Sequence, residues 1–288
     1  MPQTPFQLVA LDIDGTVLDT KDRISESFKR AVARLASQGV RSVFCTGRRW
    51  RTALRAVEQI ERAHPVVVCS GGALIKEADS HNTLYADPLA PTSARRTAEL
   101  FKRAGLVPIL LLDRPVAGRE LLISERQREQ AQELPYVITH RDSIEYYPGD
   151  FPELSEPTFE VLTVDLVSRV QRGEQIVREA MAGQAIVMAM FQPRYGPDQI
   201  ALEVHGPTAT KWRALSWLLE LWHIPPEKVV AIGDDVNDIP MLKGAGLSFA
   251  MGNAAPEVKA AARRLTSSID EDGALEALCS VWPELKDD

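Results

Sequence analysis

Short apolar segments alternate with amphipathic ones in the first part of the chain. Residues 6–13 form an apolar run that is rich in β-forming residues and too short for a helix, and residues 40–45 and 65–69 repeat this pattern. Between these runs, apolar positions recur at helical spacing after Ser25, a residue type that caps helices, and a second helix is expected over residues 50–62. The succession of strand, helix, strand, helix and strand predicts a parallel sheet with helices on its faces.

The last third of the chain repeats this order. A helix is predicted over residues 209–222, and apolar strands are predicted over residues 228–232 and 247–251. The two ends of the chain together therefore predict an α/β fold with a Rossmann-like, doubly wound parallel sheet.

The middle of the chain has a different pattern. Strand-like runs alternate there with two helical stretches, near residues 92–104 and 173–182, and prolines cluster at both edges. We therefore predict an α+β domain over residues 87–193. It is inserted into an α/β core that consists of residues 1–86 and 194–288.

Composition and charge exclude several classes of protein. A net charge of −7 argues against a general nucleic-acid binder, because such proteins carry a basic face. No apolar run is long enough to cross a bilayer, and the first residues do not resemble a signal peptide, so we expect a cytoplasmic protein that binds no membrane. Cys45, Cys69 and Cys279 are odd in number and show no CxxC pattern, so we interpret them as reduced packing residues.

Two acidic residues end the first predicted strand. Asp12 and Asp14 are two positions apart, so their side chains point the same way from an extended chain, and two close carboxylates favour a divalent cation. A calcium-binding EF-hand loop is excluded, because it needs glycine at its sixth position and glutamate at its twelfth. Here Gly15 is fourth and Arg23 is twelfth. A purely structural turn stays the alternative for this motif alone.

Three further segments carry polar groups at comparable places. Thr46 and Gly47 follow the second predicted strand, where a hydroxyl and backbone N–H groups suit a phosphate oxygen. Lys211 begins the helix after the inserted domain, although a lone lysine is usually a surface charge. Residues 234–238 place several acids and an amide directly after an apolar strand. Because the carboxyl ends of parallel strands share one edge, we expect all four segments to form one site.

Together these segments resemble the haloacid dehalogenase superfamily of phosphotransferases, and most of all its Cof-type sugar-phosphate phosphatases. The likeness covers residues 1 to about 86 and about 194 to 288. It implies that the inserted domain is a large α/β cap. It also implies Mg²⁺-dependent hydrolysis of a small-molecule phosphate monoester through an aspartyl-phosphate intermediate on Asp12.

The resemblance also implies a role for each matching residue. Asp12 would be the nucleophile, Asp14 the general acid and base, and Lys211 the cation that pairs with the phosphate. The residues expected to contact phosphate or substrate are Thr46, Gly47, Arg48, Gly71, Lys211 and Asn237. The residues expected at the metal are Asp12, Asp14 (through its backbone carbonyl), Asp234 and Asp238.

Some of these roles are open between two alternatives. Asp238 is expected to orient either Lys211 or metal-bound water, and Arg48 either reaches the phosphate or pairs with a carboxylate. Asp235 is interpreted as an exposed loop charge.

Two positions depart from the family pattern. Gly71 stands where these enzymes usually have asparagine, and Trp212 follows the lysine where they usually have glycine. Both departures concern contacts to phosphate and leaving group, so the sequence leaves the substrate open. The oligomeric state is not indicated by the sequence either.

Three rival functions were compared with a phosphatase. A phosphomutase that uses the same intermediate stays an alternative. A regulatory domain resembling a bacterial receiver is disfavoured, because its phosphorylated aspartate follows the third strand of a compact single domain. An inactive binding protein is disfavoured because all four reacting positions hold competent residues.

Overall fold

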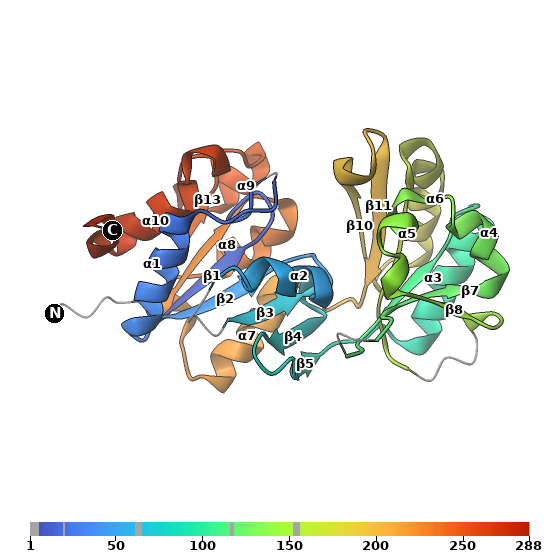
Figure 1. The fold of residues 1–288 in the computed structure, drawn as a ribbon, viewed down its shortest axis with the longest axis horizontal. Coiled ribbons are helices and arrows are strands. Elements are labelled where there is room, and N and C mark those ends of the chain that lie inside the picture. Colours follow the sequence, from blue (N-terminus) through green and yellow to red (C-terminus); the bar gives the residue numbers. More distant parts are fainter. Residues whose placement is uncertain (1–5, 20, 61–64, 116–117, 152–155, 288) are drawn as a thin grey trace. The chain divides into compact units, whose positions relative to one another are not determined.

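The computed structural model describes residues 6–19, 21–60, 65–115, 118–151 and 156–287. The chain divides into two compact units (Figure 1). The core unit comprises Met1–Ala86 and Thr210–Asp288, and the inserted unit comprises Asp87–Ala209.

An eight-stranded sheet forms the centre of the core unit, in the order β14-β13-β12-β1-β2-β3-β4-β5. Its strands are β1 (Leu8–Asp12), β2 (Arg41–Cys45), β3 (Val66–Cys69), β4 (Leu74–Glu77), β5 (Thr83–Ala86), β12 (Val229–Gly233), β13 (Leu247–Ala250) and β14 (Arg264–Leu265). The six strands from β14 to β3 are parallel, which confirms the predicted parallel sheet. The antiparallel hairpin of β4 and β5 at one edge is an addition that the sequence pattern did not predict.

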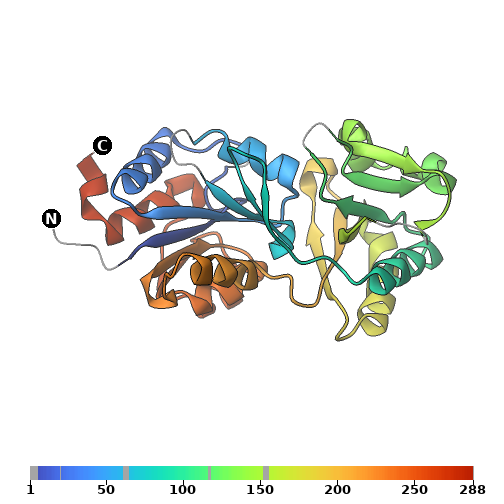
Figure 2. The ribbon, with the colours of Figure 1, turned by 90° about the horizontal axis from the view of Figure 1, so that it is seen from below.

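Helices cover both faces of this sheet, as a doubly wound fold requires. They are α1 (Glu26–Ser37), α2 (Trp50–Val57), α7 (Lys211–Leu221), α8 (Ile239–Gly244), α9 (Pro256–Ala261) and α10 (Gly273–Val281). The blue helix α1 lies on one face and the orange helix α7 on the other (Figure 2). Ser25 caps α1 as predicted, because its hydroxyl accepts a hydrogen bond from the backbone N–H of Phe28 at 3.2 Å. The helix predicted over residues 50–62 ends at Val57, and its last predicted residues, 61–62, lie outside the described residues.

The inserted unit contains a mixed six-stranded sheet in the order β10-β11-β9-β6-β7-β8. Its elements are α3 (Pro91–Arg103), β6 (Ile109–Leu112), β7 (Leu121–Ser124), α4 (Arg128–Ala131), α5 (Pro135–Thr139), β8 (Ile144–Tyr147), β9 (Thr158–Leu166), α6 (Val167–Ala180), β10 (Ile186–Phe191) and β11 (Gln199–His205). This unit extends past the predicted end at residue 193, because β11 pairs antiparallel with both β9 and β10. Residues 194–209 therefore belong to the inserted unit and not to the core.

Apolar side chains cover both faces of the inserted sheet. Leu110 and Leu202 pack with Phe101 of α3 on one face, and Leu111 packs with Val137 of α5 on the other. Within the described residues, no helix of either unit has both the length and the apolar character that a membrane span needs.

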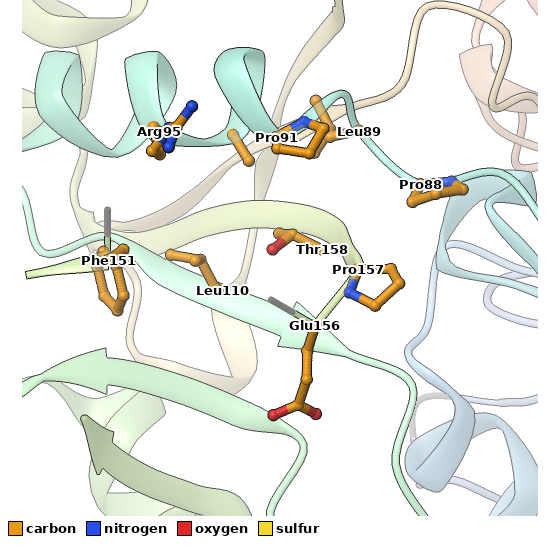
Figure 3. Close-up of a pocket in the computed structure, with 10 residues that line it drawn as sticks. Pro88, Leu89, Pro91, Arg95, Leu110, Phe151, Glu156, Pro157 and Thr158 are labelled. Carbon is orange, nitrogen blue, oxygen red and sulfur yellow. The ribbon is translucent and has the colours of Figure 1, made fainter. Parts of the chain in front are cut away.

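The inserted unit also contains a pocket (Figure 3). Its apolar lining consists of Pro88, Leu89, Pro91, Ala94, Leu110, Phe151 and Pro157. Of the charged side chains that line it, Glu156 already accepts hydrogen bonds from Arg114. The pocket holds none of the residues predicted for phosphate chemistry.

Candidate active site

The four predicted segments meet at the carboxyl edge of the core sheet. Asp12 is the last residue of β1, Thr46 directly follows β2, and Asp234 directly follows β12. Because β1 pairs with both β2 and β12, these three chain ends lie side by side. Lys211 joins them from the first turn of α7.

Lys211 lies between two carboxylates. Its Nζ donates hydrogen bonds to Asp12 Oδ1 at 2.6 Å and to Asp238 Oδ1 at 2.7 Å, and all three side chains are buried. Burial acts to lower the pKa of Lys211, but the two carboxylates outweigh it and raise this pKa. The sequence alone favours a surface position for Lys211, but in the structure its side chain is a buried, charged ammonium.

Asp238 uses both of its carboxylate oxygens. While Oδ1 accepts from Lys211, Oδ2 accepts the backbone N–H groups of Asp234 and Asp235, each at 3.0 Å. Asp235 is exposed, and its side chain accepts from the N–H of Val236 as the cap of a short 3₁₀ helix, η7 (Val236–Asp238). Asp238 therefore fixes both the lysine and the loop that carries Asp234, and Asp235 shapes that loop.

Asp234 is held by donors from two other loops. Thr16 Oγ1 donates to its Oδ1 at 3.0 Å, and Asn253 Nδ2 donates to its Oδ2 at 3.2 Å and to the carbonyl of Gly15 at 3.0 Å. Gly15 has φ of +76°, and a Cβ there would lie 2.3 Å from Asp234 Oδ2, so only glycine permits this approach. Burial and then the charge of Asp238 raise the pKa of Asp234 to about 7. Asn253 was missed by sequence reasoning, and its only signal is its position after β13 at the same sheet edge.

The donors present fit a divalent cation. One carboxylate oxygen from each of Asp12, Asp234 and Asp238 lies within 4.8 Å of the others. Burial, followed by the neighbouring charge of Asp238, raises the pKa of Asp12 well above its ordinary value, so the single positive charge of Lys211 does not offset the crowded carboxylates. Oxygen donors of this kind suit Mg²⁺. Asp238 accepts from the Lys211 ammonium and from two backbone N–H groups of its own loop, whereas Asp234 accepts from neutral side chains. Asp12 and Asp234 are therefore the side chains best placed to hold the ion.

Polar groups beside the carboxylates suit a phosphate. The hydroxyl of buried Thr46 accepts the N–H of Arg48 at 3.0 Å, which leaves its own hydrogen for another acceptor. A Cβ on Gly47 would lie 3.8 Å from Asn237 Nδ2, so these two predicted residues are neighbours. The N–H of Gly71, in contrast, already donates to the carbonyl of Thr46 at 3.2 Å. Thr46, Gly47 and Asn237 therefore lie together, while the Gly71 amide serves the loop itself.

Two buried polar atoms near this loop have no hydrogen-bond partner within the described residues. They are Oγ of Ser70, which follows β3 and was missed by sequence reasoning, and Oδ1 of Asn237. Buried polar atoms are rarely left unpaired in folded proteins. A bound phosphate oxygen would accept from the Ser70 hydroxyl, whereas Asn237 Oδ1 is an acceptor and would need a donor group.

Arg48 pairs with the second acid of the first loop. Its Nε donates to Asp14 Oδ2 at 2.7 Å and its Nη2 to Asp14 Oδ1 at 2.5 Å, and Nη2 also donates to Asp22 Oδ1 at 3.0 Å. Of the two alternatives for Arg48, the structure shows the ion pair with a carboxylate. The Asp14 side chain is consequently turned to Arg48 and is not one of the three clustered carboxylates.

The loops around the two departures from the family pattern pack closely. Gly72 has φ of +110°, and a Cβ there would lie 2.2 Å from the carbonyl carbon of Thr210, so this glycine lets the loop touch the backbone just before Lys211. Trp212 packs on Gly244 of α8, where a Cβ would lie 2.2 Å from the indole ring. The tryptophan thus contributes to docking α7 on α8.

Comparison with known proteins agrees with this fold. The family model for haloacid dehalogenase-like hydrolases matches residues 9–278. The 5-amino-6-(5-phospho-D-ribitylamino)uracil phosphatase YbjI of Escherichia coli is 27% identical over 281 residues, which cover 96% of each chain. The pyridoxal phosphate phosphatase YbhA of the same organism is 24% identical, over 89% of this chain and 91% of its own. A haloacid dehalogenase-like hydrolase from Bacteroides thetaiotaomicron superimposes with a TM-score of 0.77 at 25% identity, covering 96% of this chain and 99% of that one.

The chain therefore belongs to the haloacid dehalogenase-like hydrolases. Within that superfamily it is a phosphatase of the Cof type, which carries an inserted cap domain, as the four sequence segments predicted.

Proposed function

We propose that the protein is a Mg²⁺-dependent phosphohydrolase that cleaves a small-molecule phosphate monoester through an aspartyl-phosphate on Asp12. The observation that carries this proposal is the buried ammonium of Lys211, which contacts Asp12 directly beside Asp234. A cation next to a strand-end carboxylate serves two purposes. It draws in a phosphate dianion, and it reduces the repulsion between that dianion and the attacking oxygen.

The metal is assigned to Asp12, Asp234 and the backbone carbonyl of Asp14. Bound there, Mg²⁺ would supply neutralisation of the phosphoryl oxygens, whose negative charge otherwise resists attack. Asp238 accepts from the Lys211 ammonium and from two backbone N–H groups of its own loop, so we assign it the positioning of Lys211.

Two chemical steps follow from the residues themselves. In the first, an oxygen of Asp12 attacks phosphorus, the bond from phosphorus to the ester oxygen breaks, and Asp14 gives a proton to the departing oxygen. In the second, Asp14 takes a proton from water, which attacks phosphorus and releases Asp12 and inorganic phosphate. Lys211 and the Thr46 hydroxyl bind phosphoryl oxygens in both steps. Arg48 holds the Asp14 carboxylate at the site.

The substrate class follows from the relatives and from the division of the chain. YbjI and YbhA are named as phosphatases of a phosphorylated ribitylaminouracil and of pyridoxal phosphate, so a phosphorylated metabolite such as a sugar phosphate is proposed here. Every proposed reacting group lies in the core unit. We therefore assign selection among alcohols to the inserted unit, residues 87–209, because the chemistry recognises only the phosphoryl group.

A panel of metabolite phosphates tests this function. The purified protein should release phosphate from p-nitrophenyl phosphate and from a subset of sugar and cofactor phosphates when Mg²⁺ is present. A chelator should abolish turnover, and Mg²⁺ should restore it better than Ca²⁺, whose looser coordination misplaces the attacking oxygen. Turnover that persists undiminished in excess chelator would overturn the proposal.

A further inference from the structure

A second cluster of potential metal ligands lies in the inserted unit and shares no residue with the groups used above. It consists of Glu160 in β9 and of Glu203 and His205 in β11, the yellow strand beside β10 in Figure 1. His205 pairs with Glu160 across the two strands, and Glu203 is two positions from His205, so all three side chains project from one face of the sheet. One donor atom of each lies within 4.8 Å of the other two.

The cluster is buried and holds an unsatisfied nitrogen. The exposed fractions are 4% for Glu160, 8% for Glu203 and 0% for His205. Within the described part of the chain, Nδ1 of His205 has no hydrogen-bond partner, and its Nε2 lies 3.5 Å from Glu203 Oε2 in an ion-pair contact that lacks hydrogen-bond geometry. A buried imidazole nitrogen without a partner loses its hydration without compensation. The cluster thus contains a buried nitrogen that lacks the partner a bound cation would provide.

The electrostatics of the cluster favour positive charge. Two carboxylates, those of Glu160 and Glu203, lie beside the buried imidazole of His205. The register places apolar residues opposite the three side chains: Ile186 faces His205, Met188 faces Glu203 and Leu111 faces Glu160. An apolar surround strengthens the attraction between these carboxylates and a cation.

We propose that Glu160, Glu203 and His205 form a site for a transition-metal dication, with Zn²⁺ as the best fit. An imidazole nitrogen beside two carboxylate oxygens suits Zn²⁺, whereas Mg²⁺ prefers an all-oxygen shell such as that at Asp12 and Asp234. The separation between His205 Nε2 and Glu203 Oε2 is 3.5 Å. Two ligands of a tetrahedral ion with bonds of about 2.1 Å lie roughly 3.4 Å apart, so the pair is already spaced as ligands.

A metal at this place would cross-link β9 to β11 where β11 ends and the chain runs on to the core unit. Three protein ligands leave a fourth position of a tetrahedral ion for water or another small ligand. Because all three ligands belong to the inserted unit, a bound metal would stabilise the fold of that unit.

Metal titration of the full-length protein tests the proposal. The protein, stripped of metal and then saturated with Mg²⁺, is titrated with Zn²⁺ by isothermal calorimetry, and bound zinc is counted by mass spectrometry after dialysis. We expect one equivalent of Zn²⁺ and a higher melting temperature. Glu203→Gln and His205→Gln should each weaken Zn²⁺ by more than the roughly 10- to 100-fold typical of losing an outer-shell partner. Matched control variants in the same unit, Glu145→Gln and His140→Gln, should bind Zn²⁺ as the parent does.

X-ray absorption of the zinc-loaded parent protein gives a readout that needs no variant to fold. It should show imidazole scattering from one histidine and otherwise oxygen ligands. Failure of the Mg²⁺-saturated parent to bind zinc would overturn the proposal, as would a zinc shell without imidazole. Equal Zn²⁺ affinity in the parent, Glu203→Gln and His205→Gln would do the same.

Discussion

Replacing Asp238 tests whether this residue positions Lys211 or binds the metal. The Asp238→Asn change removes the charge that accepts from Lys211 Nζ at 2.7 Å but keeps the size of the side chain. A hydrogen bond to a charged group contributes about 1.5–3 kcal/mol. If that energy is lost where Lys211 stabilises the transferring phosphoryl group, kcat should fall about 10- to 150-fold.

The assay compares Asp238→Asn with Asp234→Asn over a range of Mg²⁺ concentrations. The Asp238 variant should lose kcat even at saturating Mg²⁺, with little change in the concentration needed for half-saturation. The Asp234 variant should instead need far more Mg²⁺, because it lacks a proposed ligand. Melting temperatures of both proteins serve as the control for folding. If excess Mg²⁺ restores kcat in Asp238→Asn, then Asp238 is a metal ligand and the reasoning from its hydrogen bonds to Lys211 and to its own loop is wrong.

Three further expectations concern the same loops. Burial and the charge of Asp238 raise the pKa of Asp234 to about 7. Below that pH, Asp234 therefore holds a proton, and Mg²⁺ must displace this proton to bind. The half-saturating Mg²⁺ concentration should therefore rise as the pH falls from about 8 to about 5.5, and a flat profile would contradict this. Gly72→Ala should destabilise the protein more than Gly149→Ala and also lower kcat. Both glycines have positive φ, but only a Cβ at Gly72 meets the Thr210 backbone, and equal melting temperatures would count against this packing. Asp14→Asn should lower kcat/KM, which reports phosphoryl transfer to Asp12, far more for alkyl phosphates than for p-nitrophenyl phosphate, whose leaving group needs no proton, and equal losses in kcat/KM would remove Asp14 as the acid.

The core fold was predictable because its apolar periodicity is strong and regular. Strand β1, which ends at Asp12, and strand β12, which directly precedes Asp234, are wholly buried apolar runs. The parallel sheet follows from the alternation of such strands with helices. The far boundary of the inserted unit was not predictable in the same way. The prolines near residue 193 mark the predicted boundary, whereas β11 lies beyond them, and only its pairing with β9 and β10 assigns it to the inserted unit.

The site was predictable in its strand-end residues and not in the contacts that support them. Nothing local to Lys211 indicates burial, which arises only when α7 brings it between carboxylates 199 and 27 positions away. The pairing of Arg48 with Asp14 joins two loops 34 positions apart. Asn253 belongs to no motif and acts through Asp234. These contacts depend on tertiary packing, which periodicity and spacing do not encode.

Detection of a covalent phosphate on Asp12 tests the central claim most directly. The Asp14→Asn variant is mixed with p-nitrophenyl phosphate and Mg²⁺, quenched in acid during turnover, digested and analysed by mass spectrometry. The account predicts phosphate on the peptide that contains residue 12, with slow decay on removal of substrate, because the base that activates water is missing. The same experiment on the Asp12→Asn, Asp14→Asn double variant should find none. Phosphate on the double variant, or on a peptide that lacks residue 12, would contradict Asp12 as the nucleophile.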